Sequence, residues 1–196
     1  MAPMREPAIR AFARELNAAT QTFSTSEEER APVYALLPTG VRANRVFVVG
    51  TLTETEDVGD EGAYWRGRVI DPTGTFFVYA GQYQPEAMAA LRNAMPPAHV
   101  AVVGKPRTYE TDAGEVNVSI RPERIVTVGE AVRRRWIVET AEHTLARLRA
   151  FADGDGDDVV RARNAYGDDV QAYREAVVRA LEGLETDEPG AEATNV

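Results

Sequence analysis

The chain has 196 residues and a formal net charge of -9 at pH 7, with a pI of about 4.9. Its length suits one domain with a proper core and appended helices rather than two full domains. It contains no cysteine, which excludes disulfides, thiol catalysis and thiolate metal sites. The acidic balance argues against an ordinary nucleic-acid-binding protein, for which a basic surface patch is expected.

The composition offers another explanation of this charge. The only lysine is Lys105, the other basic residues are arginines, and acidic residues are spread over both ends. Such a chain is typical of cytosolic proteins of extreme halophiles, whose surface carboxylates maintain solubility in concentrated salt, and an acidic mesophilic protein is the alternative. Near molar salt the Debye length is about 3 Å, so long-range repulsion and attraction are both screened. Any nucleic-acid affinity would then depend on stacking and short-range arginine contacts.

No segment of the sequence indicates export or a membrane. The first six residues lack a long apolar run, and no stretch approaches the roughly 18 to 20 apolar residues of a membrane span. We therefore expect a cytoplasmic protein without a membrane partner.

The N-terminal region predicts one helix and a lead-in. From Glu6 to Asn17 apolar residues recur at three- and four-residue spacing, which predicts an amphipathic helix with Pro7 in its first turn. Thr20 to Arg30 is polar, and we expect a mobile or weakly capped segment. Val33 to Gly40 is apolar and ends in turn residues, so it is either a lead-in that packs on the following domain or an anchored loop.

A strand and a hairpin follow. Arg45 to Thr53 is predicted as the first strand, with a bend at Gly50, and the acidic Glu54 to Glu61 as a loop. Tyr64 to Ala80 then predicts two strands around the turn Asp71-Pro72-Thr73-Gly74, because proline presets the turn torsion and glycine allows a positive φ.

The alternation of the hairpin separates two kinds of side chain. Val69, Phe76 and Val78 share the inner face, and Trp65 has the same parity. The side chains on the outer face are two arginines and two aromatic residues, which a core does not need. Arginines can hold a phosphate backbone while aromatic rings stack with bases. The outer set consists of Arg66, Arg68, Phe77 and Tyr79.

The remaining strands complete a recognisable order. Pro85 opens a short helix that ends at Pro96-Pro97. His99 to Arg107 is predicted as the fourth strand, with a bend at Gly104, and Glu115 to Arg121 as the fifth, closed by Pro122. Three strands, a helix and two more strands is the order of an oligonucleotide-binding (OB) barrel, whose nucleic-acid face is built from strands two and three and the flanking loops.

The C-terminal part predicts helices. Gly129 to Phe151 carries an apolar stripe that must cover the barrel or a partner, Asp153 to Asp158 is predicted as a flexible acidic linker, and a last helix covers about Asp168 to Leu184. The fold class is therefore mainly β, a five-stranded OB barrel preceded by one helix and followed by two. The expected division is an N-terminal helix and lead-in (1–42), the barrel (43–126), an assembly helix (127–152), an acidic linker (153–167), a C-terminal helix (168–186) and a disordered tail (187–196).

Several of these stretches together resemble a known family. The hairpin, Val102 to Arg107 and Ser119 to Glu123 resemble the archaeal replication protein A family, and Asn44 to Glu54 with the hairpin turn is similar to the haloarchaeal replication protein A-associated proteins. The resemblance covers about Pro38 to Phe151. It implies an OB-fold protein that joins the large replication protein A subunit in protecting single-stranded DNA during replication and repair. It also implies that the helix after the barrel is an assembly element. The zinc finger of many large archaeal subunits does not transfer, because there is no cysteine.

Two candidate surfaces follow from these patterns. The first surface is the outer face of the hairpin and its neighbouring strands, which is predicted to bind nucleic acid. The alternative is that it is only an exposed antiparallel face whose aromatic cross-strand pairs stabilise the sheet. The predicted nucleic-acid-binding residues are Arg66, Arg68, Phe77, Tyr79, Tyr83, Lys105, Arg107, Tyr109, Asn117 and Arg121, and the predicted partner-binding residues are Val138, Ala141, Leu145 and Leu148.

The spacing of the other polar residues does not match a calcium loop, a zinc site, a phosphate loop or a catalytic centre. The acidic run from Asp153 does not make a complete calcium loop, since Asp158 stands where glycine is needed and Asn164 where a bidentate carboxylate is needed. His99 and His143 lie on separate elements with no evident third ligand. Gly104-Lys105 lacks the rest of a phosphate loop, and no nucleophile, base and orienting group can be assembled. We therefore expect no enzyme, metal or cofactor. Two hypotheses remain: a subunit that binds single-stranded DNA directly, or a structural partner of the large subunit with little DNA contact.

Overall fold

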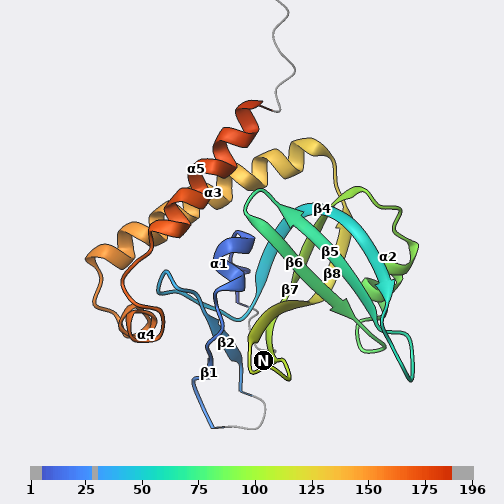
Figure 1. Cartoon of the computed structure of the whole chain (residues 1–196), viewed down its shortest axis with the longest axis horizontal. Coiled ribbons are helices and arrows are strands. Elements are labelled where there is room, and N and C mark those ends of the chain that lie inside the picture. The colour runs from blue at the N-terminus through green and yellow to red at the C-terminus, as the bar shows by residue number, and fades with distance from the viewer. Residues whose placement is uncertain (1–5, 28–30, 187–196) are drawn as a thin grey trace, which may run out of the picture.

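Five strands close into a barrel, beside which a small three-stranded sheet and the C-terminal helices pack (Figure 1). The computed structural model describes residues 6–27 and 31–186, so the predicted tail 187–196 and the end of the predicted polar segment lie outside the described residues. The strand order in the barrel is β4-β5-β6-β8-β7, and α2 connects β6 to β7. This order confirms the predicted five-stranded OB barrel. The barrel elements are β4 (Val46–Asp57), β5 (Trp65–Asp71), β6 (Gly74–Ala80), α2 (Pro85–Asn93), β7 (Ala98–Glu110) and β8 (Val116–Thr127).

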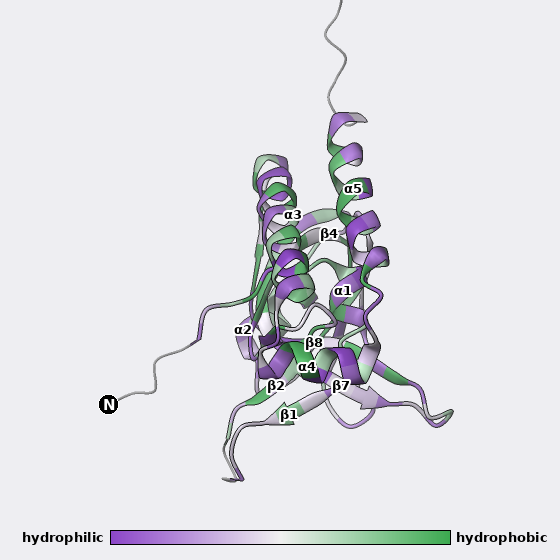
Figure 2. Ribbon diagram, turned by 90° about the vertical axis from the view of Figure 1, so that its left-hand side faces the viewer, coloured by the Kyte–Doolittle hydropathy of each residue, from purple (hydrophilic) through white to green (hydrophobic). Residues whose placement is uncertain are grey.

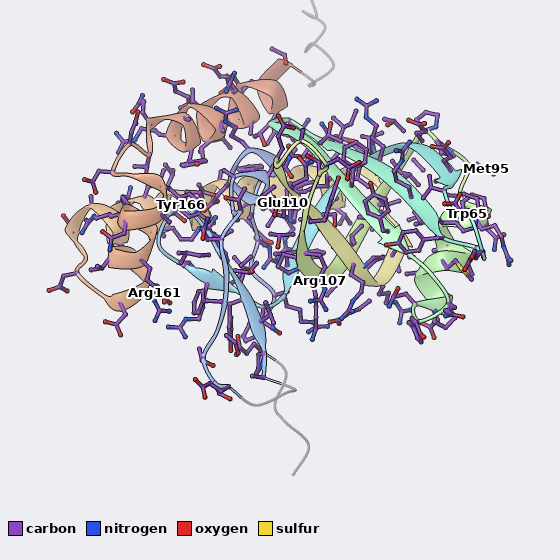
Figure 3. The ribbon with its side chains drawn as sticks, turned by 60° about the horizontal axis from the view of Figure 1, so that its bottom comes forward. Trp65, Met95, Arg107, Glu110, Arg161 and Tyr166 are labelled. Carbon is purple, nitrogen blue, oxygen red and sulfur yellow. The ribbon has the colours of Figure 1, made fainter. Side chains whose placement is uncertain are left out.

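The inward residues of the barrel form its core. Val69, Phe76 and Val78 of the hairpin are at most 1 % exposed, which confirms the predicted inner face. Leu91 of α2 is fully buried in the same cluster, so the helix closes one end of the barrel. Trp65, predicted in the core, is only partly buried and lies near that end of the barrel (Figure 3).

The two glycines predicted as bends are positions of close backbone approach. A Cβ atom at Gly50 would lie 2.5 Å from the carbonyl oxygen of Ile70, and one at Gly104 would lie 2.5 Å from that of Arg121. Any larger residue would push neighbouring strands apart, because these contacts are with backbone rather than with a movable side chain. Gly50 lies where β4 changes its pairing from β7 to β5, as a strand that serves both sides of a closed barrel must.

The N-terminal helix is shorter than predicted. Helix α1 covers only Ala13–Asn17, and Ile9 instead forms a parallel bridge with Val46 of β4. The Ile9 N–H donates to the Arg45 carbonyl at 2.8 Å, and the Ile9 carbonyl accepts from the Phe47 N–H at 2.9 Å. The prediction of a helix from Glu6 was wrong because these bonds hold the preceding backbone extended. The predicted apolar stripe is nonetheless buried from Phe12 onwards.

The turn of the β5–β6 hairpin holds α1 in place. One carboxylate oxygen of Asp71 accepts from the N–H of Ala13, the first residue of α1, at 2.7 Å. The other accepts from the N–H groups of Thr73 at 2.6 Å and Gly74 at 2.9 Å. Burial raises the pKa of Asp71 to about 6, while these hydrogen bonds act in the opposite direction. The side chain that shapes the turn therefore also caps the helix.

Three strands extend beyond their predicted ends, and one of them is β7, which reaches Glu110 instead of ending at Arg107. Strand β4 extends to Asp57, so the acidic residues 54–61 are not entirely a loop. Strand β8 continues past Pro122 to Thr127 instead of ending there. The pairing of β7 with β8 shifts at this point and leaves Glu123 as an extra residue. A proline, which has no N–H to donate, is tolerated within a strand beside such a β-bulge.

A second β-bulge lies in β4. Leu52 pairs with Val69, and the next residue of β5, Arg68, pairs with Glu54, so Thr53 is an extra residue on β4. Because the side-chain period of a strand is two, one extra residue reverses which side chains face the core. Glu54 consequently stands on the outer face of the barrel, where uninterrupted alternation from Leu52 would have turned it inward.

The segment before the barrel forms a small antiparallel sheet rather than only a lead-in. It consists of β1 (Thr22–Ser24), β2 (Val33–Leu36) and β3 (Arg42–Ala43). The prediction of a mobile polar segment was wrong for β1, which pairs with β2 along its whole length. Arg42 and Arg161 both place their guanidinium groups over the ring of Phe23, at 5.6 and 4.6 Å from its centroid. The Arg161 contact attaches the sheet to the C-terminal part of the chain, whereas the Arg42 contact lies within the sheet.

Up to residue 186, where the described part of the chain ends, three helices rather than two follow the barrel. They are α3 (Glu130–Asp153), α4 (Asp157–Tyr166) and α5 (Gln171–Thr186), and α3 and α5 lie side by side (Figure 2). Residues 153–167, predicted as an acidic linker, contain α4. Ala162 of α4 is fully buried against Leu36 and Phe151, and Arg163 donates to the Phe151 carbonyl at 2.5 Å. Asp157 and Asp158 lie in the first turn of α4, where negative charge is favourable, so the acidic start of the segment is compatible with a helix.

The buried face of α3 is rotated relative to the predicted stripe. Val138 is 41 % exposed and Leu145 is partly buried, whereas Ala141 and Leu148 are buried within this chain. The face that packs inward includes two threonines, Thr140 and Thr144. The Thr144 hydroxyl donates to the Thr140 carbonyl at 2.8 Å, which satisfies it inside the fold. Ala141 and Leu148, predicted to bind a partner, are therefore already covered by the chain itself.

Candidate nucleic-acid interface

The outer face of the β5–β6 hairpin has the side chains that alternation predicted. Arg66 pairs with Tyr79, and Arg68 pairs with Phe77. Strand β6 is followed in the barrel by β8 and then β7, so this face continues onto the outer residues of those two strands. In Figure 1, β5 and β6 face the viewer and no helix crosses in front of them. Helix α1 contacts the hairpin at its turn, through bonds to Asp71 and Thr75.

Besides Phe77, this face carries three neighbouring tyrosines, Tyr64, Tyr79 and Tyr109. The rings of Tyr64 and Tyr79 stack with centroids 5.8 Å apart and an interplanar angle of 22°. Burial raises the pKa of Tyr79, and the neighbouring Tyr109 hydroxyl raises it further. Tyr64 is 44 % exposed and Tyr109 45 %, so two of the three rings are open to solvent. Such rings are suited to stack with bases.

Tyr64 was not among the predicted site residues. It lies one residue before β5, and its parity with Arg66 and Arg68 would have placed it on the outer face of the predicted hairpin. Its backbone N–H donates to the Asp57 carboxylate at 3.1 Å, which fixes the end of the β4–β5 loop. The available signal was the aromatic residue at the start of the hairpin, and only the tertiary structure places its ring against Tyr79.

Cationic side chains occupy the β7–β8 side of the face. Lys105 pairs with Arg121, and Arg107 pairs with Ser119. Burial lowers the pKa of Arg107, and repulsion from Arg121 lowers it further. Among the described residues, no carboxylate lies within 4.0 Å of the charged group of Lys105, Arg107 or Arg121. An anion bound here would relieve the repulsion.

Arg66 differs from these cations. Its Nη2 atom lies 2.6 Å from Oε2 of Glu56 and 3.9 Å from Oε1 of Glu54, both on β4. Its guanidinium carbon lies 5.8 Å from the centroid of the Phe77 ring. The guanidinium group therefore lies over an aromatic ring while two carboxylates neutralise its charge.

Three adjoining hollows follow this face, and we call them together the groove. A hollow of about 310 Å³ is lined by Tyr64, Tyr79, Arg107, Thr108, Tyr109 and Ser119. A second, of about 610 Å³, lies between residues 58–64 and 81–84, and a third, of about 500 Å³, includes Tyr83, Lys105 and Arg121. Tyr64 lines the first and second hollows, and Tyr83, which is 85 % exposed, lines the second and third. Neighbouring hollows therefore share lining residues on the same side of the barrel.

The predicted residues divide into two groups by their position. Six line the groove directly, and Figure 3 shows one of them, Arg107, on the barrel and well away from Arg161 and Tyr166 on α4. The others lie on the strands beside it, where Asn117 pairs with Tyr109. The six are Tyr79, Tyr83, Lys105, Arg107, Tyr109 and Arg121, and the others are Arg66, Arg68, Phe77 and Asn117.

The described residues contain no other centre with evident chemistry. Across residues 6–27 and 31–186, no three histidine, aspartate or glutamate side chains are grouped so that they could hold a metal ion. No helix in that part of the chain is both long and apolar enough to cross a bilayer. The rings and cations of the groove can stack bases and contact phosphates.

No family model matches the sequence, and no curated protein matches it. Among solved structures, an OBody bound to hen egg-white lysozyme is similar with 19% identity and a TM-score of 0.35, over 43% of this chain and 80% of that one. A mitochondrial single-stranded DNA binding protein of S. cerevisiae is similar with 19% identity and a TM-score of 0.34, over 43% and 91% of the two chains. The asparaginyl-tRNA synthetase of Entamoeba histolytica has 14% identity and a TM-score of 0.35, over 55% and 30%. At these values the similarities assign neither a family nor a function to this chain.

Proposed function

We propose that the groove binds single-stranded nucleic acid. The observation that carries the proposal is the pairing of exposed tyrosines with three neighbouring cations that have no carboxylate partner among the described residues. In a chain with a net charge of -9, neutralising each of these cations with a nearby carboxylate would have been easy. Unpaired cations beside stacked rings are suited to a ligand that has both phosphates and exposed bases.

Each part of the groove has a separate role in this proposal. The rings of Tyr64, Tyr79 and Tyr109 stack with bases, and each stacked base contributes roughly 1 to 3 kcal/mol. Lys105, Arg107 and Arg121 contact phosphates. Since stacking is insensitive to ionic strength and phosphate contacts are not, binding should weaken with salt but persist near molar concentrations.

The sequence resemblance supports a finer proposal. If the chain is a companion of the large replication protein A subunit, the ligand is single-stranded DNA and the context is replication and repair. The alternative, a purely structural partner, depended on the apolar stripe of α3. Since Ala141 and Leu148 are buried within this chain, that stripe offers a partner little more than Val138 and part of Leu145. The exposed tyrosines favour direct binding over this alternative.

The direct test is fluorescence anisotropy of a labelled oligo-dT titrated with the protein alone, from dilute to molar KCl. We expect saturable binding that persists at the highest salt. The double variant Tyr79→Ala/Tyr109→Ala should abolish it. Met95→Ala removes an 86 % exposed apolar side chain outside the groove and should leave binding unchanged. Absence of binding by the unmodified protein at every salt concentration would overturn the proposal.

A further inference from the structure

Two carboxylates of β4 stand on the outer face of the barrel, across β5 from the groove. The β-bulge at Thr53 places Glu54 on the outer face opposite Arg68, and Glu56 follows opposite Arg66. Their side chains are 53 % and 52 % exposed. We call this pair of glutamates the acidic rim.

The acidic rim occupies the arginine nearest to it. Arg66 lies within 2.6 Å of Glu56, and its side chain is only 33 % exposed over the ring of Phe77. A phosphate approaching Arg66 would therefore meet two carboxylates at close range. Like charges brought together at an interface weaken binding of the wrong ligand, and at contact distance salt screens this repulsion only in part. Bases, which are neutral, approach Phe77 without that repulsion.

Cations stand on the β8 and β7 side of the groove. In the barrel order β4-β5-β6-β8-β7, the rim stands on β4, Phe77 and Tyr79 stand on β6, and Arg121, Lys105 and Arg107 stand on β8 and β7. Glu86 and Glu123 line the same hollow as Lys105 and Arg121, but Glu123 is paired with Arg45. The outer face thus has paired carboxylates at β4, the rings of Phe77 and Tyr79 next to them, and cations without an ion-pair partner among the described residues beyond these rings.

We propose that the acidic rim makes the groove selective for single strands over duplexes. This inference rests on the proposed function of the groove. A single strand can place its one phosphate backbone on the β7–β8 cations and turn its bases toward Phe77 and Tyr79. A duplex hides its bases from the rings and has a second backbone, which the rim repels. Glu54 and Glu56 therefore also orient the bound strand, with its phosphates away from β4.

The test is the double variant Glu54→Gln/Glu56→Gln, which keeps side-chain shape and an oxygen that Arg66 can donate to while removing both charges. Affinities are measured by anisotropy for a labelled mixed-sequence oligonucleotide and for the same strand in a duplex. We expect duplex affinity to rise about tenfold and single-strand affinity to change less than about threefold. The matched control, Glu182→Gln/Glu185→Gln, removes two exposed charges from α5 and should leave the ratio of the two affinities unchanged.

The outcomes separate the two proposals. If the unmodified protein binds neither ligand, the proposed function fails and the selectivity fails with it. If it binds the single strand, but the rim variant has an unchanged affinity ratio or duplex binding stays undetectable, only the role of the rim is overturned. That role is likewise overturned if the α5 control changes the ratio equally. Glu56→Gln alone, with a smaller expected change in the ratio, replaces the double variant if that variant is unstable to urea.

Discussion

Arg147 of α3 places its Nη2 atom 2.6 Å from Oε2 of Glu15 in α1, and only 10 % and 1 % of these side chains are exposed. The Thr39 hydroxyl also donates to the Glu15 carboxylate. The pair joins the first helix to the helix that follows the barrel. Because the carboxylate is buried, its charge is tolerated only while Arg147 faces it.

Replacing Arg147 with methionine should destabilise the fold strongly, since it leaves Glu15 buried and unpaired. We expect the free energy of unfolding to fall by about 3 to 5 kcal/mol. The double variant Glu15→Leu/Arg147→Met should lose less than the single one, because it leaves no isolated charge. Urea titrations followed by tryptophan fluorescence, to which Trp65 and Trp136 contribute and of which Trp136 is buried against Phe12, measure both. Arg135→Met breaks an ion pair whose arginine is 80 % exposed, and an equal loss there would contradict the prediction.

Asp71 should make stability depend on pH in an unusual direction. Its pKa is about 6 in the folded protein against an ordinary value of 3.8, so between these values the folded state holds more protons than the unfolded state. The stability contributed by this group is full below about pH 4, falls by about 3 kcal/mol as pH rises to about 6, and is constant above. Glu139, whose pKa is lowered by its hydrogen bond to Arg135, acts in the opposite direction, so a variant is needed to isolate the effect of Asp71.

The variant for this purpose is Asp71→Asn. Its amide would turn a donor toward either Ala13 or the hairpin turn, so we expect lower stability than the unmodified protein at neutral pH. Subtracting its unfolding free energy from that of the unmodified protein, across about pH 4 to 7, should yield a difference that shrinks as pH rises. A difference that is flat across this range would show that Asp71 does not titrate in it.

Truncating Tyr79 should separate stacking from hydrogen bonding. Tyr79→Ala removes a ring that stacks on Tyr64, and we expect oligo-dT affinity to fall roughly 5- to 150-fold, the equivalent of one lost stacked base. Tyr79→Phe keeps the ring and should bind nearly as well as the unmodified protein. Anisotropy at one fixed high salt concentration compares the two. Equal losses in both variants would point to the hydroxyl rather than to the ring.

The β7–β8 cations should determine the salt dependence of binding. For single strands the slope of log K against log salt changes by about 0.7 for each phosphate that the protein no longer neutralises. We expect Arg107→Gln and Arg121→Gln each to reduce the slope by about this amount. Arg135→Gln on α3 removes the same charge from a side chain that is 80 % exposed and far along the sequence from the groove, and should leave the slope unchanged. Unaltered slopes in both groove variants would exclude these arginines as phosphate ligands.

The sequence predicts the barrel well because its pattern is local. A hairpin turn with a clean alternation assigns Phe76 to the core and Phe77 to the surface, and the structure agrees for both. The order of the strands around α2 then follows. The function of the predicted groove residues stays a prediction, but their shared surface was visible in the alternation alone.

Features that depend on distant partners were not predictable in this way. An extra residue such as Thr53 has no local signal, so the strand was predicted to end where it only changes register. The buried face of α3 includes Thr144, because a hydroxyl that bonds its own helix can be buried at little cost. Helix α4 begins with aspartates and is held by Arg163 and Ala162 against residues far away in the chain.

The β-bulge at Thr53 determines which side chains of β4 form the acidic rim. Deleting Thr53 alone would leave the two faces of β4 as they are, because Glu54 would then follow Leu52 directly and still pair with Arg68 on the outer face. If Thr53 instead took the regular pairing position opposite Arg68, every later residue of β4 would change face, so that Thr53 and Thr55 would turn outward and Glu54 and Glu56 toward the core. The acidic border therefore depends on this one residue staying outside the pairing, and a change of register in β4 would remove the border without altering any side chain.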